Sequence, residues 1–255
     1  MSSPTWTPPA LASERRRFSG RCWRVVEAQH RVSTLKLVDT LAEHELLEAA
    51  IEATKPAIPP ECRHLHYLLV TPFRYRPAYP RGSRFRRAGF TPGVFYASRT
   101  VTTAIAEMAF HRLLFFAESP QTPWPANPNE FTAFGVDVRT RAALDLTRPP
   151  FDTQRAQWID CTDYEACQAL AEEARDASID VIRCESARDP DAGLNLAVLA
   201  CRAFASADPV AQQTWRLQFG SAGVRGLCTF PDQRIEFTRD AFARDPRIAS
   251  LSWAR

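Results

Sequence analysis

Residues that could bind a phosphorylated ligand are concentrated in one short stretch of the chain. Between Phe73 and Arg87 the sequence reads FRYRPAYPRGSRFRR, with six arginines, four aromatic side chains and Gly82. Guanidinium groups form forked hydrogen bonds to phosphate oxygens, and aromatic faces stack on bases or pair with cations. The composition indicates a nucleotide site, although a solvated basic loop or an RNA-binding loop would have the same composition.

One acidic residue, Glu107, lies in a predicted helix over 98–117 that is apolar on almost every side. At helical spacing it shares a stripe with Phe110 and Leu114. Buried glutamates are rare unless they are paired or functional. Glu107 is therefore either the partner of a nearby arginine or a functional carboxylate.

Ser186 is a further candidate, because it stands where a predicted strand ends and a polar turn over 189–193 begins. Together with Arg188 and Asn195 it offers hydrogen bonds for a sugar or a phosphate, although serine is also common at turns for structural reasons. No histidine stands in a convincing position for a base, which argues against a hydrolytic serine triad.

The elements that must position these residues follow from hydrophobic periodicity. The predicted strands are 21–27, 65–70, 93–97, 131–138, 179–184 and 196–199, then short antiparallel strands in the last forty residues; the predicted helices are 40–53, 98–117 and 162–177. Alternation in the third strand places Tyr96 on the face opposite Phe95. Helices and strands do not alternate regularly, and no Gly-x-Gly-x-x-Gly follows a strand, so we expect an α+β fold with a bent, mostly antiparallel sheet.

Composition and charge exclude several classes of protein. A net charge of +3 over 255 residues is too small to indicate a nucleic-acid binder, and no direct DNA binding is expected. No apolar stretch approaches the roughly 20 residues needed to span a bilayer, and the N-terminus lacks a signal sequence, so a cytoplasmic location without membrane contact is predicted.

The seven cysteines are widely spaced and contain no Cys-x-x-Cys pair, which argues against a disulfide framework and a zinc site. Most of them are expected in the core as small apolar side chains. His64 and His66 would share one face of the predicted strand 65–70, but no third ligand is visible, so no metal is predicted.

Taken together, these residues resemble the RES-domain family, which is named for its Arg, Glu and Ser. The matching pieces, in the family's order, are W-R-V at Trp23–Val25, G-S-R-F at Gly82–Phe85, G-V-F-Y-A-S at Gly93–Ser98, T-A-I-A-E at Thr103–Glu107, V-I-R-C-E-S-A-R-D-P at Val181–Pro190 and N-L-A-V at Asn195–Val198. Two positions depart from the family's usual pattern: Arg86 replaces a frequent Asn, and Cys184-Glu185 replaces Tyr-Pro.

The resemblance implies a fold like that of the ADP-ribosyltransferases, with NAD bound in a cleft between two curved sheets. It implies one catalytic domain over 19–255, with a helical insertion at about 32–60. The prolines and arginines of residues 1–18 separately predict a flexible arm before this domain. It also implies a toxin of a toxin–antitoxin pair, silenced by an Xre-type antitoxin protein. Characterised members degrade NAD, commonly by phosphorolysis, so inorganic phosphate is the expected co-substrate and no cofactor is needed.

The resemblance also assigns roles to individual residues. Glu107 would stabilise the oxocarbenium-like transition state, Arg84 would clamp the pyrophosphate or the incoming phosphate, and Tyr96 would stack on the nicotinamide or orient its ribose. The substrate-binding residues would be Arg24, Ser186, Asn195 and Arg86.

Three alternatives remain open at this point. The acceptor could be a protein side chain, which would make the enzyme a protein ADP-ribosyltransferase. The Arg- and aromatic-rich loop could form an RNA-binding module, which would not need Glu107. The chain could also be a catalytically inactive partner that binds another protein through the helix near Leu46–Ile51.

Overall fold

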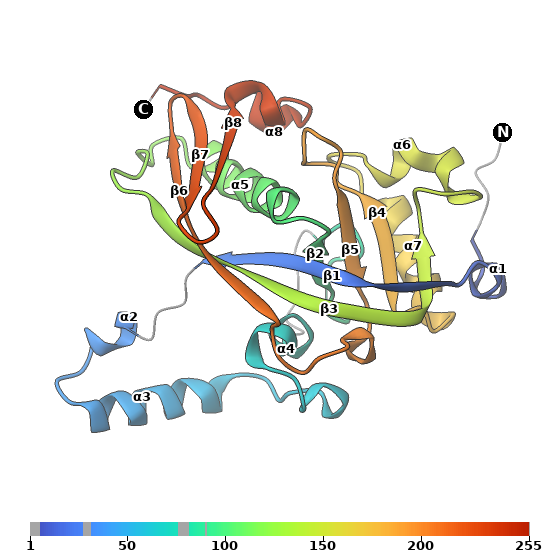
Figure 1. Cartoon of the computed structure of the whole chain (residues 1–255), viewed down its shortest axis with the longest axis horizontal. Helices are drawn as coiled ribbons and strands as arrows, with labels where there is room; N and C mark the ends of the chain where they lie inside the picture. The colour runs from blue at the N-terminus through green and yellow to red at the C-terminus, as the bar shows by residue number, and fades with distance from the viewer. Residues whose placement is uncertain (1–5, 28–31, 76–81, 90, 255) are drawn as a thin grey trace.

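The structure is a computed structural model that describes residues 6–27, 32–75, 82–89 and 91–254. Within these ranges the strands form one eight-stranded sheet flanked by helices (Figure 1). The strands are β1 Arg16–Glu27, β2 Phe95–Ser98, β3 Asn129–Asp145, β4 Val181–Glu185, β5 Leu194–Val198, β6 Ala211–Gly220, β7 Gly223–Cys228 and β8 Gln233–Thr238. The prediction of an α+β fold is confirmed.

The sheet has the order β1-β2-β5-β4-β3-β6-β7-β8, and an additional pairing of β1 with β3 closes its first five strands into a ring. All pairings are antiparallel except that of β3 with β4. The long strand β3 belongs to both halves, because residues 143–145 pair with β4 and residues 129–135 pair with the β6–β8 meander. In Figure 1 the meander rises at a steep angle to β1 and β3, so the sheet is strongly bent.

The helices are α1 Pro8–Ser13, α2 Val32–Leu35, α3 Leu41–Thr54, α4 Tyr67–Arg74, α5 Val101–Glu118, α6 Arg155–Trp158, α7 Glu165–Asp176 and α8 Pro246–Ala249. Short 3-10 turns lie at Pro60–Cys62, Phe151–Gln154, Cys201–Ala203 and Arg239–Phe242. None of the helices in the described residues has the length and apolar character needed to span a bilayer.

Three hydrophobic clusters hold these elements together. Each strand of the ring contributes to one cluster, in which α4 also packs. A second cluster joins α5 to the meander and a third joins α7 to β4 and β5. Because alternate residues of a strand face opposite sides, Phe95 enters the ring cluster while Tyr96 packs with the α7 cluster, as the alternation predicts.

The segment 65–70 is not the strand that its apolar run indicates. It enters α4, which begins after His66, whose ring nitrogen Nδ1 accepts a hydrogen bond from the Leu68 amide at 3.2 Å. A short, continuous apolar run does not distinguish a buried strand from a buried helix. The helix is favoured because Leu69 and Phe73, four residues apart, both become buried against the ring.

The N-terminal residues are more ordered than the flexible arm that we expected over 1–18. α1 begins at Pro8, and prolines are favoured in the first turn of a helix because they need no amide partner there. Leu11 is fully buried in the α7 cluster, and β1 begins at Arg16, where it pairs with β3. Residues 1–5 lie outside the described part of the chain.

The predicted helix 40–53 is confirmed as α3. A capping box starts it, since the Thr40 hydroxyl accepts from the Glu43 amide at 3.2 Å and the Glu43 carboxylate accepts from the Thr40 amide at 3.1 Å. None of its residues is buried, and Figure 1 shows α2 and α3 projecting from the body of the protein. Leu41 and Leu46 are more than 70% exposed.

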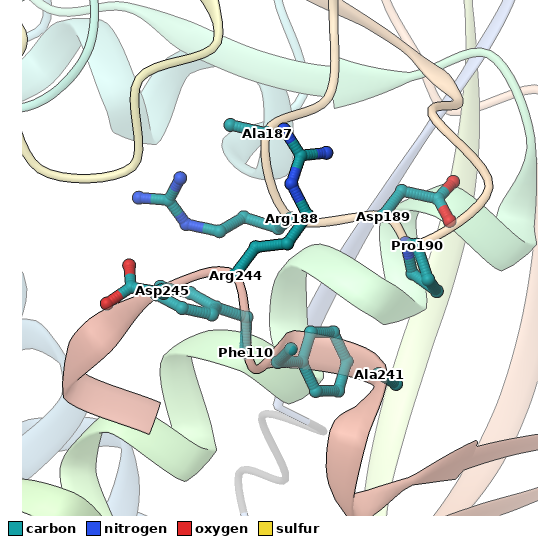
Figure 2. Close-up of a pocket in the computed structure, with 9 residues that line it drawn as sticks. Phe110, Ala187, Arg188, Asp189, Pro190, Ala241, Arg244 and Asp245 are labelled. Carbon is teal, nitrogen blue, oxygen red and sulfur yellow. The ribbon is translucent and has the colours of Figure 1, made fainter. Parts of the chain in front are cut away.

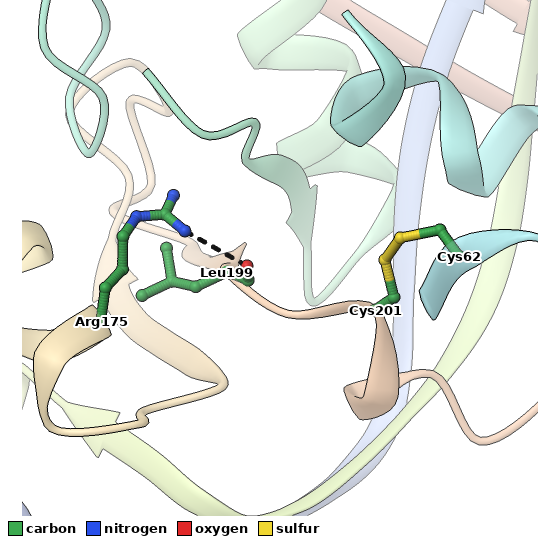
Figure 3. Close-up of a disulfide and its surroundings, with 4 residues drawn as sticks. All are labelled: Cys62, Arg175, Leu199 and Cys201. Carbon is green, nitrogen blue, oxygen red and sulfur yellow. Dashed lines mark hydrogen bonds between the residues drawn. A yellow bond between two sulfur atoms is a disulfide. The ribbon is translucent and has the colours of Figure 1, made fainter. Parts of the chain in front are cut away.

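The cysteine spacing argued against a disulfide framework, but two of the cysteines are bonded to each other. Cys62 and Cys201 form a disulfide, and in sequence they are 139 residues apart (Figure 3). The bridge links the segment before α4 to the turn after β5. Leu199 precedes this turn, and its carbonyl accepts a hydrogen bond from Arg175 of α7 at 3.3 Å. Sequence spacing could not reveal this pair because the two residues meet only when α4 has packed against the ring of strands.

The disulfide can be tested by counting thiols. Two of the seven cysteines are bonded, so the protein unfolded without a reductant should show five reactive thiols. The same protein unfolded with a reductant should show seven. Cross-links over long loops typically contribute about 2–5 kcal/mol, so Cys62→Ser should lower the unfolding midpoint clearly. Cys161→Ser, which removes a free thiol, is the matched control. Seven thiols before reduction would show that the bridge is absent.

Candidate active site

A cavity of about 720 Å³ lies where β1, β2, β5 and the end of β4 meet α5. The loop around Gly82–Phe85 and the α8 segment complete its walls. The volume is in the range of small-molecule and cofactor sites, roughly 300–1,000 Å³. The cavity is also cationic, since its lining contains four arginines, Arg24, Arg84, Arg188 and Arg247, against two glutamates, Glu107 and Glu118.

Glu107 lies on the wall that α5 contributes, and one of its oxygens is held by two neutral donors. The Ser186 hydroxyl and the Asn195 amide both donate to Glu107 Oε1 at 2.6 Å. The Asn195 carbonyl in turn accepts from the Ser98 hydroxyl at 2.6 Å. Among the described residues the hydrogen bonds to this carboxylate all go to Oε1, so Oε2 is the oxygen left for a ligand.

Ser186 is fully buried and supports the carboxylate from behind. Its Oγ accepts from the backbone amides of Arg188 at 3.1 Å and Asp189 at 2.9 Å, which directs its hydroxyl hydrogen to Glu107. The residue does not line the cavity. Ser186 therefore positions Glu107. The sequence had predicted a direct contact between Ser186 and the substrate.

Tyr96 lines the cavity from β2, and its hydroxyl fastens the arginine loop. It forms a hydrogen bond with the Ser83 hydroxyl at 2.8 Å and accepts from the Phe85 amide at 3.0 Å. Burial raises the pKa of Tyr96 to about 12, so the phenol stays neutral at physiological pH. Tyr96 therefore lines the cavity while its hydroxyl holds the loop.

Arg84 reaches the cavity from this loop and is bound at its far end. Its two terminal nitrogens donate to the carbonyls of Trp158 at 2.7 Å and Asp160 at 2.8 Å, and its Cζ lies 5.0 Å from the centre of the Tyr164 ring. The guanidinium is therefore fixed in place, as preorganised binding of an anion requires.

Arg24 lines the cavity from β1. Its Nη1 donates to the Tyr96 carbonyl at 2.9 Å, and its Cζ lies 5.1 Å from the Phe95 ring centre. Burial lowers the pKa of Arg24 to about 10, so the side chain still carries its charge at neutral pH.

Arg86 is not brought to the cavity. Its Nε and Nη2 donate to the hydroxyl and the carbonyl of Thr91 at 2.9 and 3.0 Å, which closes the loop on itself. Phe85 is 2% exposed. In the described part of the loop Arg84 lines the cavity, Arg86 binds Thr91 and Phe85 is buried, which weakens the interpretation as an RNA-stacking surface. Residues 76–81 of the loop lie outside the described residues.

Two residues that line the cavity, His111 and Arg247, were not predicted from the sequence. His111 lines the cavity one helical turn after Glu107, a spacing that could have identified it, although we expected no histidine in a base position. Desolvation lowers the pKa of His111, so it is neutral at pH 7. Arg247 comes from α8, and no sequence signal links that segment to the cavity.

Neither a cysteine nucleophile nor a metal centre is built from the described residues. Burial raises the pKa of Cys184, which lines the cavity, well above its ordinary value, so its thiol stays protonated and unreactive. The described part of the chain contains no group of three or more His, Cys, Asp and Glu side chains arranged to hold a metal ion.

Comparison with known proteins gives a structural match and a family match. Among solved structures, the crystal structure of the M. tuberculosis MbcT–MbcA toxin–antitoxin complex matches over 94% of this chain and 97% of that chain, with 16% sequence identity and a TM-score of 0.45. No protein of curated function matches. The RES domain model matches residues 58–220, which is more than half of the 255 residues and includes Arg84, Glu107 and Ser186. The chain belongs to the RES domain family.

Proposed function

We propose that this protein cleaves NAD at the bond between nicotinamide and ribose, with inorganic phosphate as the acceptor. The bond from the ribose C1'' to the pyridinium nitrogen breaks, and its electron pair leaves with neutral nicotinamide. A phosphate oxygen forms the new bond to C1'', which gives ADP-ribose 1''-phosphate. The observation that carries the proposal is a carboxylate, Glu107, fixed by two donors in the wall of a large cationic cavity.

Glu107 has the chemistry that this reaction needs. Positive charge grows on the ribose ring as the bond breaks, and a fixed carboxylate stabilises that charge without having to reorganise. Hydrogen bonds from a carboxylate to sugar hydroxyls add to this effect in enzymes that cleave glycosidic bonds. The departing nicotinamide needs no proton, so the site needs no strong general acid.

The surrounding residues support binding of a dinucleotide. Arg24 on β1 and Arg84 on the loop before β2 offer fixed positive charges for phosphate groups. The Tyr96 ring is available for stacking on the nicotinamide. Asn195 and Ser186 contribute by orienting Glu107.

Family membership supports the cellular role that we propose. The protein would act as the toxin of a toxin–antitoxin pair in the cytoplasm, silenced by an Xre-type antitoxin protein. In the alternative enzymatic function, a protein side chain replaces phosphate as acceptor at the same site. Labelled NAD separates the two, because the label moves to protein in one case and to a small phosphorylated product in the other.

Glu107→Gln should reduce nicotinamide release from NAD by roughly 100- to 1,000-fold, because the neutral amide cannot stabilise the developing positive charge. Purified protein would be incubated with NAD, with and without inorganic phosphate, and nicotinamide followed by chromatography. Glu45→Gln, on exposed α3, is the matched control and should leave the rate unchanged. Absence of nicotinamide release from folded wild-type protein under both conditions would overturn the proposed function.

Asn195→Ala should lower kcat about 10- to 100-fold, the effect expected when a charged group loses one hydrogen-bond donor. The KM for NAD should change little, because Asn195 acts on Glu107 rather than on the substrate. Asn127→Ala, at an exposed position, is the control. A rise in KM with an unchanged kcat would show instead that Asn195 binds NAD directly.

A further inference from the structure

A hollow outside the main cavity is too small to be a second ligand site. It measures about 10 Å³, and the residues that line it include Ala187, Arg188 and Arg244. Figure 2 shows that the Arg244 side chain extends toward Ala187. The space is enough for one water molecule at most. Two features of the described residues that the proposed reaction does not use lie instead on the outer surface of the protein.

The most exposed apolar side chains of the described residues lie in two places. Leu37, Leu41 and Leu46 belong to the segment of α2 and α3, and each is more than 70% exposed. Leu227 lies on β7 and Phe230 in the turn after it, and these side chains are 59% and 84% exposed. Clusters of apolar side chains that remain open to water mark surfaces that meet another molecule.

We call residues 32–55 the extension, because α2 and α3 project from the body of the protein (Figure 1). One side of α3 is held by α2, since the Thr34 hydroxyl donates to Glu48 Oε1 at 2.8 Å and lies 2.8 Å from His44 Nε2. Leu46 is two residues from both His44 and Glu48. At about 3.6 residues per turn, this separation puts it on nearly the opposite side of the helix. The Leu46 side chain therefore points away from α2, into solvent.

The extension is acidic, unlike the chain as a whole. Residues 32–55 include five acidic side chains and two lysines, so the extension carries a net charge of −3, whereas the whole chain carries +3. Asp39 is exposed, and in the sequence it stands between Leu37 and Leu41. A surface that fits the extension is therefore apolar and positively charged.

The outer side of the β6–β8 meander is a surface of this kind. The pairing register places Leu227 of β7 between Arg216 of β6 and Arg234 of β8, and all three side chains are exposed. Phe230, in the turn that joins β7 to β8, adds a second exposed apolar side chain. We call these four residues the meander face.

Acidic residues do not cancel the charge of the meander face. Residues 211–238 contain three arginines and two acidic side chains, so their net charge is +1. One of these acids, Glu236, lies opposite Arg225, outside the row that contains the leucine. Glu130 lies 3.7 Å from Arg216, whose side chain stays 64% exposed, and exposed ion pairs contribute little. The meander face thus keeps a charge opposite in sign to that of the extension.

We propose that two copies of this chain associate by exchanging extensions, so that the extension of each copy docks on the meander face of the other. A single contact of this kind is small, because a specific interface uses roughly 20–30 residues per side and α3 has 14 residues. In a two-fold exchange each copy contributes both surfaces, which doubles the contact and closes the assembly at two copies. The exchange does not rest on the proposed function, and the extension and the β7–β8 hairpin both lie outside the family match at 58–220.

Pairing of two extensions with each other is disfavoured by their charge. Each extension carries −3, and Glu43 lies one helical turn before Leu46 on α3. Two helices packed through Leu46 would bring these acids together, and like charges across an interface repel each other. The exchange places each acidic extension against arginines instead.

Sedimentation velocity of the full chain over a range of concentrations tests the exchange. Wild type should pass from monomer to dimer as the concentration rises. Asp39→Arg and Arg234→Glu should each weaken the dimer by about tenfold or more, because either change sets like charges against each other at both contacts. Asp176→Arg and Arg139→Glu, at exposed positions outside both surfaces, are the matched controls and should associate as wild type does.

An equal mixture of Asp39→Arg and Arg234→Glu should recover the affinity that each variant lacks alone. In the mixed dimer one contact joins the changed extension to the changed meander face, and the other joins two unchanged surfaces. Opposite charges then face each other at both contacts. A fluorescent label on one variant allows the mixed dimers to be measured separately.

Phe230→Ser tests the apolar part of the meander face independently of charge, and it should also weaken the dimer by about tenfold, the effect of losing one buried aromatic side chain. Three results would overturn the exchange. Wild type could stay a monomer at every concentration, Arg234→Glu and Phe230→Ser could both leave a dimer unchanged, or the mixture could associate no more tightly than its two components.

Discussion

The hydrogen bonds from Ser186 and Asn195 to Glu107 Oε1 are the interaction on which the site depends. They join α5 to the turn after β4 and to β5, so they fix the helix against the closed ring of strands. A partly buried carboxylate needs such partners, because removing it from water without hydrogen bonds costs free energy. The same bonds give the carboxylate one orientation, with Oε2 left for the cavity.

Close packing keeps these partners in place. A Cβ atom at Gly193 would lie 2.1 Å from Thr103 Oγ1 and 2.3 Å from Asp189 Oδ2, so only glycine allows the turn to approach the start of α5. The Gly193 carbonyl also accepts from the Ser186 amide at 2.6 Å. The position of Ser186, and through it that of Glu107, is thus set by backbone contacts rather than by flexible side chains.

The arginines of the cavity combine a structural task with an electrostatic one. Arg84 and Arg24 donate to backbone carbonyls, which hold their guanidinium groups without neutralising them. Arg86 lies outside the cavity lining, and it closes the loop through hydrogen bonds to Thr91. A positively charged cavity with fixed donors is therefore present before any ligand binds, and it needs little reorganisation to receive phosphate groups.

Local sequence patterns determined the parts of the site that depend on a single element. Helical periodicity placed Glu107 on the stripe of α5 that reaches the cavity, and alternation separated Tyr96 from Phe95. The same patterns failed for residues 65–70, because a short apolar run suits a buried helix as well as a buried strand.

Tertiary structure decided which residues meet. Ser186 and Asn195 are 79 and 88 residues from Glu107, so the sequence indicated them as candidates but not as its partners. The Cys62–Cys201 bridge and the approach of Arg247 likewise exist only once the ring of strands and the C-terminal segment have packed. Periodicity records which face of an element is buried, whereas contacts between distant elements depend on how those faces are assembled.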